Sequence, residues 1–319
     1  MMPAVSAQGF VANTDREWFF YLRAKGPVEE VNFWQPSGGD HFRAIPPGAP
    51  FFFRLKSPFN AIAGFGFYSR FEFAPAWLAW DSFGDLNGAP DLNTMVARIK
   101  RYRSREADVR GARPDGFTIG CIMISSPVFF DDADWVREPA DWQSNIVRGK
   151  RIDILHGEGQ RIFAECLERS SRLDVQAETV AVAVDASRRG APVLVEPRLG
   201  QGTFRIALVS AYEGACAVTH ERSLPVLEAA HIKPFATGGP HNLSNGLLLR
   251  ADVHRLYDKG YMTVTGDRVV RVSERLVDDF HNGREYLRLK GARIALPRAP
   301  AEQPSRDLLD WHAQEVFLG

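Results

Sequence analysis

The chain has 319 residues, of which 45% are hydrophobic and 24% charged, a composition typical of a globular protein with room for about two domains. Lys and Arg together number 39 and Asp and Glu also number 39, so the net charge gives no indication of a nucleic-acid partner. No stretch approaches the roughly 18 consecutive apolar residues of a membrane span, and the first residues lack the pattern of a secretory signal. The three cysteines, Cys121, Cys166 and Cys216, are too far apart to predict a disulfide framework or a CxxC metal site. We therefore expect a cytoplasmic protein without a membrane partner.

The first half of the chain is rich in aromatic residues and has the pattern of strands. Three segments predict strands, the second with glycines where a bulge is expected: Phe51–Lys56, Ile62–Tyr68 and Phe117–Ile124. Between the last two, the sequence predicts a helical segment around Trp77–Phe83 and a basic helix over Leu92–Arg105. Strands that enclose one or two helices favour a small, curved α+β barrel.

A domain boundary is expected between about residues 175 and 195. A helix predicted over Glu158–Ser171 precedes the segment Arg188–Pro192, whose Gly and Pro are typical of a hinge. We predict one domain over residues 1–180 and a second over residues 190–319, with a core at 216–264. The second domain is expected to include a strand over Thr203–Val209 and to end in a helix over Arg306–Phe317.

The stretch Cys216–Val264 is the most informative part of the sequence. A short strand over Val226–His231 is predicted, followed by a glycine loop and then by an asparagine before an apolar run. Next comes a short helix that places a His and an Asp on one face, because they are four residues apart. The residues that define this pattern are, in chain order, His231, Gly238, Gly239, Asn245, Gly246–Leu249, His254, Asp258, Gly260 and the strand Tyr261–Val264.

This pattern resembles the HNH nucleases, whose ββα-metal fold is named for a His, an Asn and a second His. His231, Asn245 and His254 match those positions. The flanking sequences Leu-Glu-Ala-Ala-His-Ile-x-Pro, Asn-Gly-Leu-x-Leu and His-x-Leu-Tyr-Asp-x-Gly are similar to the restriction-type branch, some members of which act on modified DNA. The resemblance implies a divalent-metal-dependent endonuclease that hydrolyses DNA phosphodiester bonds.

The resemblance also implies a role for each matching residue. His231 is expected to be the general base, since His is the side chain that titrates near neutral pH. His254 and Asp258 are the expected ligands of one divalent cation, for which Mg, Mn, Ni and Zn are candidates. Asn245 completes the catalytic set, mainly by holding the geometry.

The sequence departs from the family at the position before the first His. Many HNH enzymes have a metal-binding Asp or His there, and this chain has Ala230. Whether His231 acts as base or as metal ligand therefore stays open. Glu228 precedes His231 by three residues and so faces the other side of a regular strand. We expect it to be a plain strand residue, with support of the metal site from a second shell as the alternative.

The N-terminal half faintly resembles the PUA-like superfamily, which includes the SRA, EVE and ASCH domains. The resemblance lies in Phe51–Tyr68, and it implies a DNA-targeting module that reads a modified or flipped base. A flipped base needs aromatic faces and a few polar groups, and the candidate pocket residues are Trp34, Trp77, Trp80 and Asp81. Packing of the second and third of these in the core is the alternative. The candidate phosphate contacts are Arg98, Lys100, Arg101 and Arg105, with a solvated helix face as the alternative.

The expected fold class is thus α+β, with a PUA-like curved β-barrel domain followed by an HNH ββα-metal domain. The function we predict is that of a modification-dependent restriction enzyme that acts on DNA, in defence against phage. One alternative is a generic HNH nuclease in repair or toxicity whose N-terminal domain binds protein. Another is a non-cleaving DNA-binding protein whose HNH site has decayed. A homodimer is left open.

Overall fold

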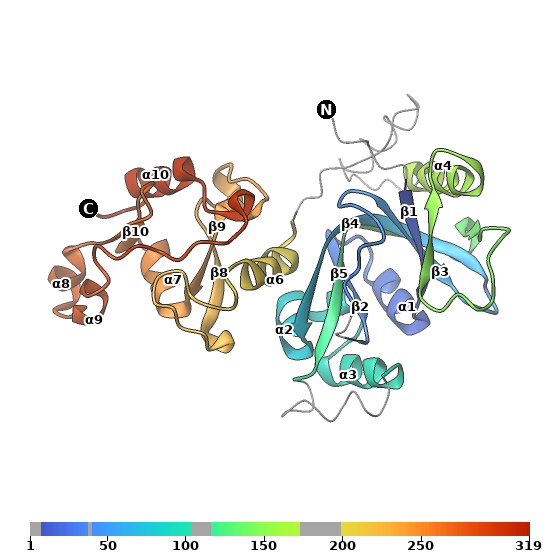
Figure 1. Ribbon diagram of the computed structural model, residues 1–319, viewed down its shortest axis with the longest axis horizontal. Helices are drawn as coiled ribbons and strands as arrows, with labels where there is room; N and C mark the ends of the chain where they lie inside the picture. The colour runs from blue at the N-terminus through green and yellow to red at the C-terminus, as the bar shows by residue number, and fades with distance from the viewer. Residues whose placement is uncertain (1–7, 38–39, 104–115, 173–198) are drawn as a thin grey trace. The chain divides into compact units, whose positions relative to one another are not determined.

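The computed structural model of the protein describes residues 8–37, 40–103, 116–172 and 199–319. The chain divides into two compact units, Met1–Thr203 and Phe204–Gly319, and each is described by itself (Figure 1). The predicted hinge at Arg188–Pro192 lies outside the described residues. Within the described ranges, no helix is both long enough and apolar enough to cross a membrane.

The first unit is built on a sheet of seven strands, counted over the described residues. The strands follow the order β2-β5-β4-β3-β1-β7, and β6 pairs with β4 at one side of this path. Strands β1 and β3 are parallel, and the other pairs are antiparallel. The strands are β1 (Gln8–Thr14), β2 (Glu30–Gln35), β3 (Pro50–Leu55), β4 (Ala61–Pro75), β5 (Thr118–Phe129), β6 (Val136–Arg137) and β7 (Gly149–Asp153).

Two glycines allow the long strands β4 and β5 to approach closely. A Cβ atom on Gly64 would lie 2.3 Å from the carbonyl oxygen of Val128, and one on Gly66 would lie 2.5 Å from Cγ2 of Ile124. The register of β4 against β5 shifts between Phe65 and Phe67, on either side of the second glycine. The irregularity predicted from glycines in this strand is therefore present, and a larger residue would push the strands apart.

Helices pack around this sheet, and their ends follow local sequence signals. Asp15 caps the first helix by accepting a hydrogen bond from the backbone N–H of Trp18 at 2.9 Å, and Glu17 follows in the first turn. Asp91 caps the basic helix in the same way through the N–H of Thr94 at 2.8 Å. The helices of this unit are α1 (Arg16–Lys25), α2 (Ala76–Phe83), α3 (Leu92–Arg101) and α4 (Gly157–Arg172).

The core of the first unit is largely aromatic. Phe52, Phe65 and Phe67 are fully buried on the sheet, and α4 covers them. The predicted face of that helix is confirmed, because Ile162 and Cys166 are both 0% exposed. This rigid packing of sheet and helix fixes the strands that surround the cavity described below.

The second unit is a small α+β assembly. Its first element, α6 (Gln201–Ala211), begins just before the boundary between the units. Strands β8 and β9 form one antiparallel pair, and β10 and β11 form another. The remaining elements are β8 (Leu227–His231), β9 (Gly246–Arg250), α7 (Ala251–Asp258), β10 (Met262–Val264), β11 (Val270–Val272), α8 (Arg275–Phe280), α9 (Arg284–Leu287) and α10 (Arg306–Glu315). The predicted α+β class is confirmed in both units.

One predicted element of the second unit is wrong. The segment Thr203–Val209 was expected to be a strand, and it lies inside helix α6. A short apolar run fits a buried helix as well as a buried strand, so periodicity alone does not separate them. Phe204, Ala207 and Leu208 are all buried, at a spacing that places them on one face of a helix. Tertiary packing of this face overrides the strand propensity of the run.

Candidate active site and cavity

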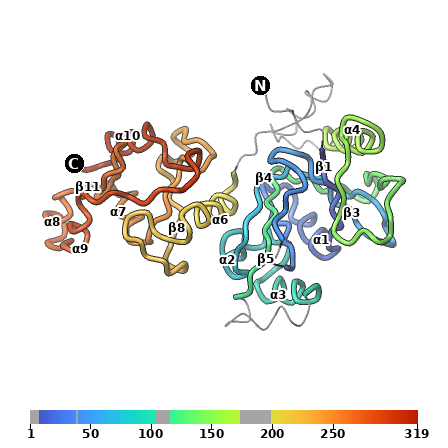
Figure 2. The backbone as a smooth tube through the Cα atoms, viewed as in Figure 1, coloured from blue at the N-terminus to red at the C-terminus, as the bar shows by residue number. Residues whose placement is uncertain are grey.

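The hairpin β8–β9 and the helix α7 form the frame of the candidate active site, and Figure 2 traces the backbone through them. His231 closes β8 and pairs with Gly246, the first residue of β9. Helix α7 starts directly after β9 and carries His254 and Asp258 on its last turns. Gly260, at φ +75°, ends the helical segment as predicted, since this left-handed conformation favours glycine. The local chain order thus brings the strand end and the helix into one small region.

His231 is clamped between two aromatic rings. Its imidazole stacks on Phe204, with ring centroids 4.1 Å apart and an interplanar angle of 4°, and meets the edge of Phe235 at 4.3 Å. Its Nε2 atom is buried and has no hydrogen-bond partner among the described residues. Burial, with smaller contributions from positive charge on His241 and His254, lowers the pKa of His231 to about 4. The imidazole is therefore neutral near neutral pH and held in one orientation, with a buried nitrogen that has no hydrogen-bond partner among the described residues.

His254 lies between two carboxylates. Its Nδ1 is 2.7 Å from Oε2 of Glu228, and its Nε2 is 3.4 Å from Oδ2 of Asp258. Burial raises the pKa of Asp258, an effect that His254 opposes and Glu228 reinforces. A carboxylate on Nδ1 fixes the tautomer in which Nε2 carries the lone pair, the usual support of a metal-bound His. Such an arrangement makes His254 a competent metal ligand.

The donor set fits a divalent cation, since imidazole suits Zn or Ni and carboxylate suits Mg or Mn. His254 and Asp258 offer one imidazole nitrogen and one carboxylate at neighbouring positions, and Mg²⁺ is commonly held by one or two protein groups together with waters and substrate phosphate. Over the ranges that the structure describes, three or more His, Cys, Asp or Glu side chains do not gather into a closed cage for a metal ion.

Glu228 makes the kind of contact that the sequence interpretation gave only as the alternative to a plain strand residue. Strand alternation does separate it from His231, as expected, and the face on which it lies is the one that meets α7. The missing signal was tertiary: only the packing of α7 on the hairpin reveals that this face is occupied by His254. Glu228 supplies a carboxylate two residues before Ala230, the position where many HNH enzymes have a metal-binding residue and this chain has none.

Asn245 holds the loop between His231 and β9. The side chain is fully buried, and its Oδ1 accepts a hydrogen bond from the backbone N–H of Lys233 at 2.8 Å. Its Nδ2 donates to the carbonyl oxygens of Lys233 at 2.9 Å and Pro240 at 3.1 Å. Gly239 passes so close that a Cβ there would lie 2.0 Å from the Lys233 carbonyl oxygen. Asn245 therefore acts on the backbone that follows His231.

The side chain of Lys233 is a second feature that the sequence interpretation missed. Its Nζ lies 5.0 Å from the ring centroid of Trp311 on α10, within the range of a cation–π contact. Lys233 is two residues after His231, and Asn245 fixes its backbone on both sides. No ion pair involving Lys233 occurs among the described residues. The ammonium group is thus positioned by an aromatic ring and free to meet an anion.

Cys216 is a packed thiol, as the sequence predicts. It is fully buried, and its sulfur accepts hydrogen bonds from the backbone N–H groups of Arg250 at 3.3 Å and Thr219 at 3.4 Å. These contacts join the segment before β8 to the point where β9 passes into α7. The cysteine therefore supports the hairpin rather than a metal knuckle.

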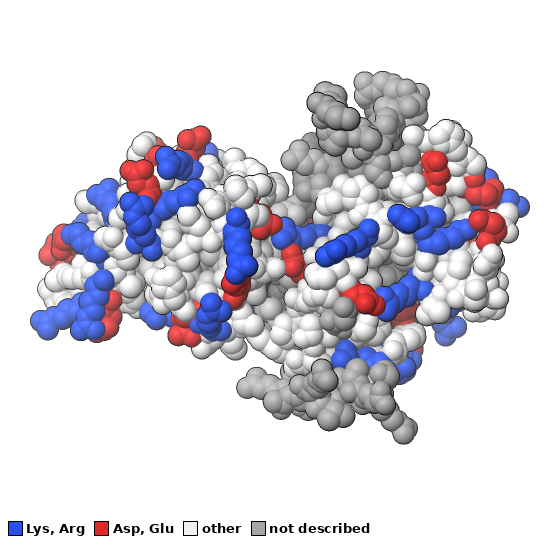
Figure 3. Space-filling view, viewed as in Figure 1, with Lys and Arg blue, Asp and Glu red and all other residues white. Residues whose placement is uncertain are grey.

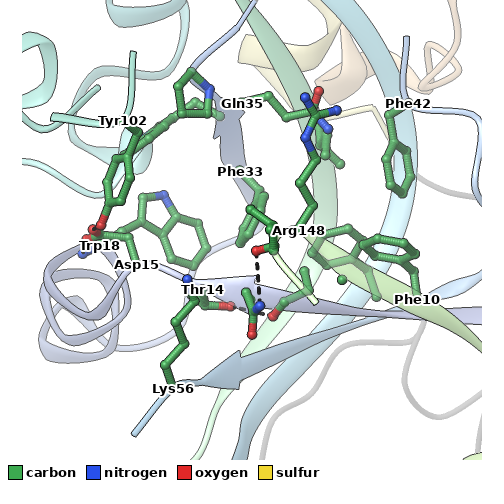
Figure 4. Close-up of a pocket in the computed structure, with 18 of the residues that line it drawn as sticks. Phe10, Thr14, Asp15, Trp18, Phe33, Gln35, Phe42, Lys56, Tyr102 and Arg148 are labelled. Carbon is green, nitrogen blue, oxygen red and sulfur yellow. Dashed lines mark hydrogen bonds between the residues drawn. The ribbon is translucent and has the colours of Figure 1, made fainter. Parts of the chain in front are cut away.

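The first unit contains a large cavity of about 960 Å³, bounded by β1, β2, β3 and the start of α1 (Figure 4). Trp18 and Tyr102 lie on one side of it, Phe10 and Phe42 on the other, and Phe33 between them. The polar side chains that line it include Asn13, Thr14, Asp15, Gln35, Lys56 and Arg148. Aromatic walls with a few polar groups are typical of a small-molecule or base-binding site.

The predicted pocket residues fall in two places. Trp34 lines the cavity and is 7% exposed, with its Nε1 donating to the carbonyl oxygen of Asn87 at 3.2 Å. Trp77, Trp80 and Asp81 lie on α2 and are not among the residues that line this cavity. Leu78 and Ala79 are the residues of α2 that face the core, and the two tryptophans are half-buried. Helical spacing placed the two tryptophans close together on α2, but it could not show that none of the residues of α2 lines this cavity.

Two of the four predicted phosphate contacts, Arg98 and Arg101, are engaged within the unit. Nε of Arg98 is 2.8 Å from Oε2 of Glu17 and its side chain is 13% exposed, while Arg101 makes a two-pronged hydrogen bond to the same carboxylate at 2.9 and 3.1 Å. Lys100 is exposed, and Arg105 lies outside the described residues. Figure 3 shows basic and acidic side chains interspersed on the visible surface. Part of this basic cluster therefore joins α3 to α1.

Comparison with known proteins agrees with the site in the second unit. Residues 216–265 match a family described as "HNH endonuclease". Among solved structures, the chain is similar to a "Modification dependent TagI restriction endonuclease", with 13% identity, a TM-score of 0.28, and coverage of 95% of this chain and 79% of that one. It is also similar to "ASCH from Zymomonas mobilis", with 11% identity, a TM-score of 0.25, and coverage of 50% of this chain and 95% of that one. No curated protein matches the chain.

The site and the family match define the class of the second unit. The hairpin, the helix and the three residues His231, Asn245 and His254 lie inside the matched region. The resemblance to HNH nucleases stated from the sequence is confirmed, and the chain is an endonuclease that carries an HNH domain.

Proposed function

We propose that the chain is a metal-dependent DNA endonuclease in which His231 is the general base, His254 and Asp258 hold the cation, and Glu228 orients His254. The single observation that carries this assignment is the pairing of a buried, neutral His231 with the Glu228–His254–Asp258 set. A bound divalent cation would stabilise the negative charge that builds up on the cleaved phosphate. The test compares cleavage of duplex DNA after addition of Mg or Mn with cleavage in the presence of a chelator instead of the metal.

His231 is suited to take a proton from the attacking water. Its Nε2 atom lacks a partner, and two phenylalanine rings hold the imidazole in one orientation. A general base has to reach the proton that it abstracts within one hydrogen bond, so DNA binding has to bring the attacking water to this buried nitrogen. This geometry favours the role of general base over that of metal ligand for His231, a choice that the sequence left open.

Lys233 is proposed as a contact to the DNA backbone near the cleaved bond. It follows His231 by two residues, and both its backbone and its ammonium group are held in place, by Asn245 and Trp311. A fixed ammonium group without an acidic partner is a ready contact for a phosphate oxygen. Asn245 acts here as a positioning residue, since its amide bonds go to the loop.

We also propose that the first unit reads a modified base, so that the whole chain acts as a modification-dependent restriction enzyme. Support comes from the cavity, which has aromatic rings on opposite sides and polar groups between them. Extruding a base from a duplex costs a few kcal/mol, which stacking and hydrogen bonds in such a pocket can offset. Cleavage of matched modified and unmodified duplexes tests this role, and equal cleavage of both would contradict it.

A further inference from the structure

The cavity of the first unit is larger than one flipped nucleotide requires. Its volume of about 960 Å³ lies at the upper end of the range for ligand pockets. A nucleotide has about 20 non-hydrogen atoms and needs about 600 Å³ if each takes the ~30 Å³ of a liquid water molecule. About 300 Å³ or more is left over, which is room for a ring-sized group of about 10 further atoms.

Aromatic side chains line two opposite sides of the cavity, and Phe33 and Phe51 join the two sides. The ring centroid of Phe33 is 5.3 Å from that of Trp18 and 5.0 Å from that of Phe51, and Phe51 is 5.6 Å from Phe10. Trp34 and Tyr102 lie near each other, with ring centroids 6.2 Å apart, and Trp18 is on the same side of the cavity. Phe10 and Phe42 form an edge-to-face pair at 5.0 Å on the opposite side. Two aromatic surfaces on opposite sides can each pack against a ring of a bipartite ligand.

Two polar groups differ in whether they are available to such a ligand. Asp15 is already engaged, because its carboxylate accepts from the N–H of Trp18 at 2.9 Å and from the hydroxyl of Tyr102 at 2.6 Å. Gln35 also lines the cavity, and its Oε1 is buried without a hydrogen-bond partner among the described residues. A buried acceptor without a partner is costly, and a donor from a ligand would satisfy it.

We propose that this cavity accepts a flipped base that carries a polar, ring-sized substituent, of the chemical class of a glycosylated hydroxymethylpyrimidine. The inference rests on the proposed function and names the class of modification. The side with Trp18 and Tyr102 takes the base, the side with Phe10 and Phe42 takes the substituent ring, and Gln35 accepts a hydrogen bond from an amino or hydroxyl group of the ligand. A methyl group alone would leave most of the extra volume empty.

The test is binding of the full chain, in the presence of a chelator, to four duplexes of one sequence. They carry cytosine, 5-methylcytosine, 5-hydroxymethylcytosine or glucosylated 5-hydroxymethylcytosine at one position. We expect the glucosylated duplex to bind at least about tenfold more tightly than the methylated one, a difference of about 1.4 kcal/mol. Tightest binding of a methylated or hydroxymethylated duplex overturns the inference about size and leaves the reader function standing. Equal binding of all four overturns both.

A second variant separates a filled cavity from a damaged fold. Ala44 lines the cavity and is half-buried, so Ala44→Trp adds volume inside it without removing a core side chain. We expect this variant to lose the preference for the glucosylated duplex over the methylated one. Ala97 is exposed on α3 and does not line the cavity, so Ala97→Trp is the matched control and should keep the preference. An unchanged preference in Ala44→Trp would contradict the proposal.

Discussion

The candidate active site of the second unit and the cavity of the first unit are built in opposite ways. The active site gathers its main residues from one hairpin and the helix that directly follows it, between Leu227 and Asp258. The cavity draws on β1, β2, β3, the end of α3 and the segment before β7, which are spread over most of the first unit. A local site leaves a motif in the sequence, whereas a cavity assembled from distant strands leaves only scattered aromatic residues.

The first prediction separates chemistry from recognition. His231→Ala should reduce cleavage by ~10²–10⁴-fold, the usual effect of removing a general base. DNA affinity measured in a chelator should change little, since the variant leaves the first unit intact. Cleavage rates on a duplex with Mn or Mg give the measurement. Near-wild-type cleavage would show that His231 is not the general base. It would then contradict the proposal that this site in the second unit performs the cleavage.

The second prediction concerns a buried histidine that supports α7. His312 on α10 stacks on Tyr257 at 3.7 Å and shares a 2.8 Å hydrogen bond with Thr263, and burial lowers its pKa from 6.5 to about 4. The unfolded chain therefore binds more protons than the folded chain between these two values, so stability should fall as the pH drops from about 6.5 to 4. The contribution is up to about 3 kcal/mol.

Urea unfolding followed by tryptophan fluorescence at several pH values checks this linkage. His312→Phe should reduce the dependence between pH 6.5 and 4, and part of it should remain because burial lowers the pKa of His231 in the same way. His281→Asn, at an exposed left-handed position, should leave the dependence as in the wild type. If His312→Phe keeps the full slope, the loss of stability in acid comes from other groups. The difference between the two units becomes clearer if only the second unit loses stability over this pH range.

The third prediction tests the carboxylate that the sequence interpretation set aside. Glu228→Ala should weaken Mn binding by ~10–100-fold, because His254 loses the partner that fixes its tautomer. Glu228→Gln keeps an acceptor for the Nδ1 hydrogen and should lose less. Calorimetric titration gives the affinities, and Glu285→Ala, which removes an exposed carboxylate paired with Arg288, is the control. Equal Mn affinities for the wild type and Glu228→Ala would show that Glu228 is a plain strand residue with no role at the metal site.

The fourth prediction has the smallest effect and concerns Lys233. Lys233→Gln should lower the slope of log affinity against log salt by about 0.9, the value of one phosphate contact on duplex DNA. The change should be the same for modified and unmodified duplexes, because phosphates carry no information about the base. Lys290→Gln removes a lysine paired with Glu274 and should leave the slope unchanged. A change in discrimination instead of slope would place Lys233 in base recognition.

The sequence predicted the elements of both units better than it predicted their side-chain contacts. The strand that ends at His231, the helix that carries His254 and the glycine that ends it were all predicted, because turn residues and helical spacing are local signals. Helix α6 was mistaken for a strand because a short apolar run has no distinctive period.

The missed contacts share one physical cause. Glu228 meets His254, Lys233 meets Trp311, and Trp34 rather than Trp77 lines the cavity, and each of these facts depends on which faces pack together in three dimensions. The same holds for Arg98. A basic helix predicts a phosphate contact, but the structure places the carboxylate of Glu17 beside the Arg98 side chain. Residue type and spacing identify candidates, and packing decides between them.

The most direct test of the division of labour measures cleavage and binding together on matched glucosylated and methylated duplexes. Wild type, His231→Ala and Ala44→Trp are compared as full chains, with binding measured in a chelator and cleavage measured with Mn. The account predicts that His231→Ala loses cleavage and keeps the preference between the duplexes, while Ala44→Trp loses the preference and still cleaves both. A variant of either unit that loses both properties while remaining folded would contradict the claim that one unit reads the base and the other cuts the strand.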